Sequence, residues 1–199
     1  MLFRVWHPSP HTATSRTMRR YGPLYRLDHH PPGPTTTHAP DGPTVWYGSA
    51  SLETGVHETF VRGADTVTIC AAHRVSAVVI DSPCPTVPLD AAATRQRVGV
   101  PDDIGDDLGV DVDGYATTQA WARWLAGITG VDAARYWSAR HRARTDRRHG
   151  INTVLWREPG EWREVARHRL TDDAVWAYVA VALDRAGVAW ERMPRCGRC

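Results

Sequence analysis

The stretch YGSASLETGVHETF, residues 47 to 60, constrains the fold most, because it passes from strand to helix chemistry within a few residues. The residues that lead into it, TVWYGS, are largely β-branched and aromatic and indicate a strand. Ser51 is a suitable N-cap for a helix that begins at Leu52, and Leu52, Val56 and Phe60 then form one apolar stripe. The stretch is therefore interpreted as the end of a strand, a short polar cap and the first turns of a helix.

Two polar neighbours in this helix, His57 and Glu58, serve no obvious purpose in the core. At about 100° per residue, Glu58 lies on the face away from the apolar stripe, so its side chain faces either solvent or a cleft. A solvated glutamate is the more ordinary of the two interpretations, because glutamate is rarely buried without a partner. A zinc-protease HExxH helix would need a histidine at position 61, which is Val61, so that motif is absent.

The remaining elements alternate between strands and helices without internal repeats. Residues 66–80 predict two strands or one long bent strand, and INTVLW, residues 151–156, predicts another. A helix is expected from Thr117 or Thr118 to residue 128, with its tryptophans in the core, and another over residues 172–186, ending at Gly187. The mixed order favours an α+β or mixed α/β fold.

A chain of 199 residues suffices for one domain with a substantial core. Residues 1–20 are polar, threonine-rich and basic, and we expect them to form an N-terminal extension. The domain itself is expected over residues 21–190, followed by a C-terminal tail over residues 191–199. No stretch has the length and apolarity of a signal peptide or a membrane span, so a soluble, cytoplasmic protein is expected.

The composition excludes several kinds of chemistry. All 24 basic residues are arginine, which excludes a Schiff-base or Walker-type lysine. The terminal CGRC, Cys196 to Cys199, has CxxC spacing, but neither Cys70 nor Cys84 belongs to a second such pair, so we expect no metal and a reduced tail. The sequence DVDG at 111–114 lacks the further ligands of a calcium loop, so we interpret it as a solvated acidic loop.

Four short motifs occur in a characteristic order. They are LYR at 24–26, WYGSASLETGVHE at 46–58, TTQAWARWLAGI at 117–128 and YWSAR at 136–140. In this order and spacing the chain, from about residue 22 to 157, resembles the RES domain family, the toxins of bacterial toxin–antitoxin pairs. The resemblance implies a single domain with an ADP-ribosyltransferase-like fold, in which helices flank a central, mostly antiparallel or mixed sheet. It also implies an enzyme that degrades NAD+ at the nicotinamide–ribose bond by hydrolysis or phosphorolysis.

The resemblance assigns the family's functional residues to Arg26, Tyr47, Glu58 and Ser138. Loss of nicotinamide leaves an oxocarbenium-like ribose, which a carboxylate such as Glu58 would stabilise. Arg26 and Ser138 would bind phosphate, and Tyr47 would form the wall beside the nicotinamide ring. Arg140 is a further candidate ligand because it lies close to Ser138. NAD+ is then a substrate rather than a cofactor, with inorganic phosphate as the candidate co-substrate.

The chain also departs from the family pattern. Family members usually carry a second arginine, followed by an aromatic residue, in the loop before the tyrosine strand, whereas TTTHAPDGP at 35–43 contains no arginine. His38 stands near that place but is only partly charged near neutral pH. DAAR at 132–135 replaces a glycine-containing stretch of the family.

Other functions stay open. Five arginines could form a nucleic-acid patch, namely Arg140, Arg142, Arg144, Arg147 and Arg148. An ADP-ribosyltransferase acting on a macromolecule often has Glu or Gln two residues before the catalytic glutamate, where this chain has Val56. A catalytically silent binding homologue is the third alternative. A toxin would also have an Xre-type antitoxin that blocks the NAD+ cleft, and would form a homodimer or a larger toxin–antitoxin complex.

Overall fold

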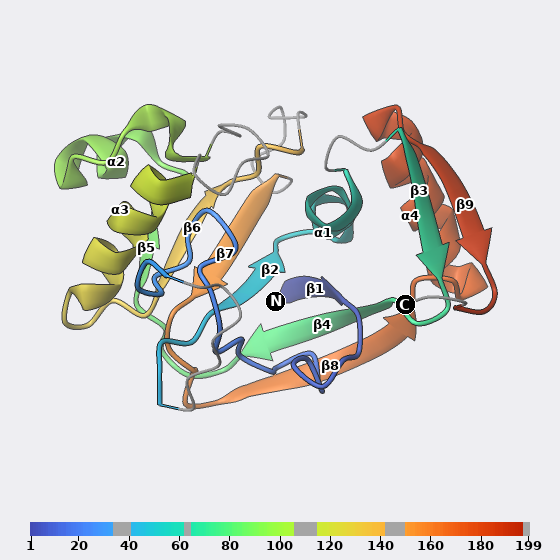
Figure 1. The fold of residues 1–199 in the computed structure, drawn as a ribbon, viewed down its shortest axis with the longest axis horizontal. Coiled ribbons are helices and arrows are strands. Elements are labelled where there is room, and N and C mark those ends of the chain that lie inside the picture. The colour runs from blue at the N-terminus through green and yellow to red at the C-terminus, as the bar shows by residue number, and fades with distance from the viewer. Residues whose placement is uncertain (34–40, 62–64, 106–114, 142–149, 197–199) are drawn as a thin grey trace.

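The structure is a computed structural model that describes residues 1–33, 41–61, 65–105, 115–141 and 150–196. A seven-stranded sheet crosses the molecule in the order β5-β6-β7-β2-β1-β4-β8, and β3 and β9 form a second, two-stranded sheet (Figure 1). The strands of the large sheet are β5 (Thr86–Pro88), β6 (Ala133–Trp137), β7 (Ile151–Leu155), β2 (Trp46–Ser49), β1 (Leu2–Trp6), β4 (Arg74–Ile80) and β8 (Trp162–Arg169). Only the β5–β6 pair of this sheet is parallel. The predicted mixed α+β single domain is confirmed.

The expected N-terminal extension is wrong, because residues 2–6 form β1 in the middle of the large sheet. β1 pairs with β4 along its whole length, from Leu2 opposite Val78 to Trp6 opposite Arg74, and with β2 through Phe3 opposite Ser49. A five-residue strand gives little local signal, and its partners lie more than 40 residues away in the sequence. Pairing with β2 and β4 therefore makes residues 2–6 a strand, although the residues that follow them are polar.

The stretch analysed first folds as expected. Helix α1 (Leu52–Phe60) follows β2, and the Oγ of its N-cap Ser51 accepts a hydrogen bond from the backbone N–H of Thr54 at 3.2 Å. His57, in contrast, does contribute to packing: it is buried, and its Nε2 lies 2.8 Å from the carbonyl oxygen of Ala182 in α4 (Asp173–Ala186). α1 therefore packs between the sheet and α4.

α4 stands beside the small sheet of β3 (Thr66–Cys70) and β9 (Ala189–Met193), which pair in parallel. As predicted, the helix ends at Gly187, which is in the left-handed conformation with φ of 70°. β9 continues to Met193, so the predicted domain boundary at residue 190 falls inside a strand.

The other helices are α2 (Ala92–Val98), the short 3-10 helix η1 (Asp102–Gly105) and α3 (Ala116–Gly127). α3 begins two or three residues earlier than predicted, because its N-cap position is Tyr115 rather than Thr117 or Thr118. The expectation that its tryptophans belong to the core is wrong for Trp124, which is 49% exposed. Among the described residues, no helix has the length and apolar character needed to cross a membrane.

Two groups of helices cover the same face of the large sheet. Phe3 packs with the core of α1 and α4, whereas Tyr47 packs with the core that includes α3. Phe3 lies opposite Ser49, and Tyr47 is two residues from Ser49 along β2, so Phe3 and Tyr47 point to one side of the sheet. Figure 1 shows α3 and α1 on that side with β2 and β7 between them. The candidate site lies over these middle strands.

Candidate functional site

A cavity of about 470 Å³ opens over the middle strands, which is a typical size for a small-molecule site. Glu58 contributes a carboxylate to the lining of this cavity, and four arginines and five tyrosines line it as well. These arginines and tyrosines come from distant parts of the chain: Arg4, Arg19, Tyr21, Tyr25, Arg26, Tyr47, Tyr115, Tyr136 and Arg140.

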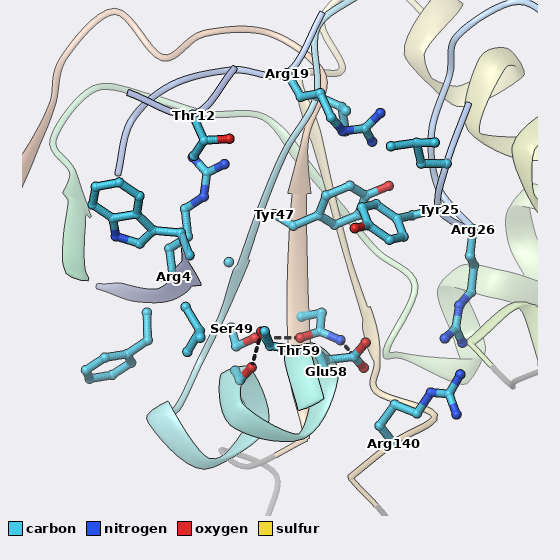
Figure 2. Close-up of a pocket in the computed structure, with 18 of the residues that line it drawn as sticks. Arg4, Thr12, Arg19, Tyr25, Arg26, Tyr47, Ser49, Glu58, Thr59 and Arg140 are labelled. Carbon is cyan, nitrogen blue, oxygen red and sulfur yellow. Dashed lines mark hydrogen bonds between the residues drawn. The ribbon is translucent and has the colours of Figure 1, made fainter. Parts of the chain in front are cut away.

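Glu58 points into the cavity from α1, which answers the question of the helix face raised by the sequence. Its Oε1 accepts a hydrogen bond from the hydroxyl of Ser138 at 2.5 Å and from the Nδ2 of Asn152 at 2.8 Å. The Oδ1 of Asn152 accepts in turn from the hydroxyl of Ser49 at 2.7 Å (Figure 2). The carboxylate is therefore held in one orientation by donors from the loop after β6 and from β7.

Ser138 acts on the carboxylate rather than on the open part of the cavity. Its side chain is buried, and its Oγ also accepts the backbone N–H groups of Arg140 at 3.1 Å and His141 at 2.9 Å. The hydroxyl has these two backbone donors and one acceptor, Glu58, which occupies its ordinary hydrogen-bonding capacity. In this arrangement the serine positions Glu58.

Arg26 and Tyr47 lie with Glu58 around the same cavity, as the sequence predicts. Arg26 is buried, and its guanidinium carbon is 6.0 Å from the centre of the Tyr115 ring. Tyr25 meets Tyr47 edge to face, with 5.7 Å between ring centres. These contacts give the cavity an aromatic wall that carries fixed positive charge.

Asp28, which sequence reasoning missed, organises the far end of this wall. It is fully buried and forms a salt bridge of 2.6 Å with Arg19. Its oxygens also accept the hydroxyl of Tyr47 at 2.7 Å and the backbone N–H groups of Leu24 and Tyr25 at 2.5 and 3.0 Å. Asp28 therefore fixes both an arginine and a tyrosine of the cavity.

The environment of Asp28 changes the protonation behaviour of its partners. Burial raises the pKa of Tyr47 well above its ordinary value, and the charge of Asp28 adds to this effect. Burial works to lower the pKa of Arg19, but the charge and hydrogen bond of Asp28 outweigh it, so the net shift is upward. Tyr47 is therefore a neutral hydrogen-bond donor and Arg19 a fixed cation.

Arg4 and Arg19 supply positive charge that the sequence analysis did not find. The predicted loop around His38 lies outside the described residues. Arg4 comes from β1 and donates to the carbonyl oxygens of Ser15 and Thr17, both at 2.8 Å. Burial lowers the pKa of Arg4 to about 10, so it stays protonated at neutral pH.

The candidate residues converge although their elements are far apart. Figure 2 shows Arg4 to the left of Tyr47 and Arg19 above it, while the guanidinium groups of Arg26 and Arg140 lie on the side to which the Glu58 carboxylate points. The five predicted residues thus come together, four at the cavity and Ser138 through its hydrogen bond to Glu58. One oriented carboxylate among several cations suits a substrate with anionic groups and a carbon centre that develops positive charge.

Most of the arginine patch on which the nucleic-acid alternative rests lies outside the described residues. Of the predicted arginine patch, only Arg140 is described, and it lines the cavity. The acidic loop at 111–114 also lies outside the described part of the chain.

Two comparisons with known proteins bear on this site. The family model of the RES domain matches residues 1–179 of the 199-residue chain, so the match includes β1 and every candidate site residue. No curated protein matches the sequence.

Proposed function

The chain belongs to the RES domain family, and on that basis we propose that its cavity binds NAD+ and cleaves the nicotinamide–ribose bond. RES domains are known from toxin–antitoxin systems. The observation that carries the proposal is the fixed carboxylate of Glu58 at a cavity lined by four arginines.

The reaction would proceed through a cationic ribose. The bond between C1′ and the nicotinamide nitrogen breaks, and its electron pair leaves with nicotinamide, which neutralises the pyridinium charge. Positive charge then develops on C1′ and the ring oxygen, where the Glu58 carboxylate lowers its energy. Water that forms a bond to C1′ releases a proton to solvent and gives ADP-ribose, whereas an oxygen of inorganic phosphate that forms this bond gives the corresponding ribosyl phosphate.

The other side chains would bind the rest of the substrate. Arg26 and Arg140 would bind the pyrophosphate through charge-assisted hydrogen bonds, since they line the cavity on the side that the carboxylate faces. Tyr47, held by Asp28, would form the wall beside the nicotinamide ring. Ser138 was expected to contact phosphate directly, and its buried hydrogen bonds support a positioning role instead.

Transfer of ADP-ribose to a macromolecule has less support in this chain. The position two residues before Glu58, where such transferases often carry an acid or amide, is Val56. Val56 is apolar and completely buried in the core of α1 and α4. This position therefore offers no second polar group to an acceptor. Water or phosphate is therefore the proposed acceptor.

The family also suggests partners. We extend the proposal to an Xre-type antitoxin whose segment covers the NAD+ cavity, and to a homodimer or larger toxin–antitoxin complex. Inhibition of purified protein by such an antitoxin at stoichiometric amounts would test the contact.

Nicotinamide release from NAD+ by the purified protein, measured by liquid chromatography with and without phosphate, tests the activity. The proposal expects release, with ADP-ribose as the product in water alone and a ribosyl phosphate if phosphate is the acceptor. Absence of release from folded, antitoxin-free protein under both conditions would contradict it and favour a silent binding homologue. Labelled NAD+ incubated with cell lysate distinguishes transfer, because macromolecules would then retain the label.

A further inference from the structure

A cluster of imidazole and thiol groups, which the proposed reaction does not use, lies where three distant segments meet. His7 directly follows β1, Cys70 is the last residue of β3, and Cys196 lies three residues after β9. One ring nitrogen of His7 and the Sγ atoms of Cys70 and Cys196 all lie within 4.8 Å of one another. Ligands of these types at such separations are characteristic of a zinc site.

Sheet pairing brings the three segments together. β1 ends beside the start of β4, with Trp6 opposite Arg74, and Cys70 ends β3 just before the turn that leads into β4. β3 and β9 are in register at Cys70 and Met193, and the N–H of Ala71 donates to the carbonyl oxygen of Met193 at 3.1 Å. Figure 1 shows β3 and β9 side by side, with the end of β3 next to the start of β4. The cluster is therefore a consequence of the fold.

Two further observations point to a ligand at this place. The Nε2 of His7 is buried and has no hydrogen-bond partner among the described residues, although such atoms are normally satisfied. His73 stands beside the cluster, with its ring 5.3 Å from that of His7 and its Nδ1 3.5 Å from the Sγ of Cys70. This Nδ1 also accepts the backbone N–H of Cys70 at 3.3 Å, a hydrogen bond that metal ligation would replace. Two ligands of one tetrahedral zinc ion, at bond lengths of about 2.3 Å to sulfur and 2.0 Å to nitrogen, would be separated by about 3.5 Å.

We propose that His7, Cys70 and Cys196 bind one Zn²⁺ ion in the reduced protein, with His73 as the fourth ligand once its Nδ1 releases the backbone N–H of Cys70. Cysteine and histidine together suit a borderline-soft divalent cation, and four protein ligands suit a structural site. Cys196 is disulfide-bonded in this structure, so the reduced tail expected from the sequence is wrong, and the site requires prior reduction by a thiol or phosphine. Binding then displaces the thiol protons of Cys70 and Cys196 into solvent.

The proposed ion would connect the end of β1, the β3–β4 turn and the segment after β9. From the sequence we expected no metal, because neither Cys70 nor Cys84 belongs to a second CxxC pair. His73 comes from the turn, in a Cys-x-x-His arrangement at residues 70–73, and His7 directly follows β1, in the segment expected to be an N-terminal extension. This inference does not depend on NAD+ chemistry.

The test uses the full chain, reduced with a phosphine, dialysed and loaded with Zn²⁺ or Co²⁺. We expect about one equivalent of metal per chain and, with Co²⁺, a thiolate-to-metal charge-transfer band. Cys70→Ser and His7→Gln should each weaken binding by at least about tenfold. Cys84→Ser and His168→Gln are the matched controls, because the Cys84 thiol and the exposed His168 imidazole do not belong to the cluster, and both variants should bind metal like the wild type.

Two results would overturn the zinc site. One is the absence of stoichiometric metal in the reduced wild type, and the other is a His7→Gln variant that binds as tightly as the wild type. His7→Gln keeps the test valid if the buried Cys70→Ser variant does not fold, which circular dichroism would show.

Discussion

Glu58 shows how a helix position acquires a chemical role through residues that are distant in sequence. From the helix periodicity alone, the Glu58 side chain could face either solvent or a cleft. Ser138 and Asn152, about 80 and 94 residues further along the chain, decide the matter by donating to the same carboxylate oxygen. Their contribution to the proposed reaction can be separated from their contribution to stability.

We predict that Ser138→Ala lowers kcat for nicotinamide release by about tenfold to a hundredfold with little change in KM, because the carboxylate loses a fixed donor. Ser76→Ala is the matched control: Ser76 is equally buried and accepts a hydrogen bond from the Nε1 of Trp6 at 3.0 Å. It should cost stability without lowering kcat. Equal kcat in the Ser138→Ala and wild-type proteins would refute the positioning role.

Asp28 provides a prediction about stability. Asp28→Asn keeps the size of the side chain but leaves Arg19, whose side chain is only 10% exposed, without its counter-charge. We expect a loss of about 3 kcal/mol in the free energy of unfolding, measured with urea. Asp81→Asn removes a comparable but exposed partner of Arg163 and should cost less than about 1 kcal/mol. Similar losses in both variants would contradict the account of Asp28.

The sequence and its family resemblance located Arg26, Tyr47, Glu58, Ser138 and Arg140, but not the residues that hold them. Asn152 did leave a signal, since it is a polar residue inside the apolar strand INTVLW. Arg4 and Arg19 left none, because their charge reaches the cavity only through β1 and the pairing around it. Local patterns therefore identified the chemical groups, and non-local packing assigned them partners.

At the scale of elements, local signals were reliable where capping and periodicity agreed. α1 has a side-chain cap and an apolar stripe, and α4 has a glycine end, so both were predicted closely. β1 has neither kind of signal, and only its pairing with β2 and β4 identifies it as a central strand. The fold class could be predicted because it depends on element order, whereas the strand order could not.

Gly48 tests the packing of β2 directly. A Cβ atom at this position would lie 2.3 Å from Cη2 of Trp46, a side chain that is completely buried. We predict that Gly48→Ala lowers the free energy of unfolding by about 1–3 kcal/mol. Gly127→Ala is the control, because a Cβ there meets nothing within 4 Å and alanine favours the helix. A stable Gly48→Ala protein would contradict the packing described for β2.

At the scale of the whole molecule, two core regions on one face of the sheet leave the cavity between them.

His29 lies near α3 and links the stability of the fold to pH. Burial, and next the neighbouring His30, lower the pKa of His29 from 6.5 to about 4. Its Nδ1 is buried without a hydrogen-bond partner among the described residues, which fits a neutral ring.

His29 predicts a loss of stability in acid. Between the two pKa values the unfolded chain binds a proton that the folded protein does not, so stability present above pH 6.5 falls as the pH drops toward 4. The loss for this group is at most about 3 kcal/mol. His29→Gln should therefore reduce the pH dependence of the free energy of unfolding over this range, measured with urea. An unchanged dependence would exclude His29 as its source.

The central claim is that the oriented carboxylate of Glu58 makes this cavity a catalyst. The most direct measurement compares nicotinamide release from NAD+ by the wild type, Glu58→Gln and Glu53→Gln. Glutamine keeps an oxygen that can accept from Ser138 and Asn152, whereas Glu53 lies on the same helix and pairs with Arg185 at 3.2 Å. We predict that Glu58→Gln lowers turnover by about 10²–10³-fold without unfolding the protein, while Glu53→Gln retains it. Turnover by Glu58→Gln equal to that of the wild type would contradict the claim.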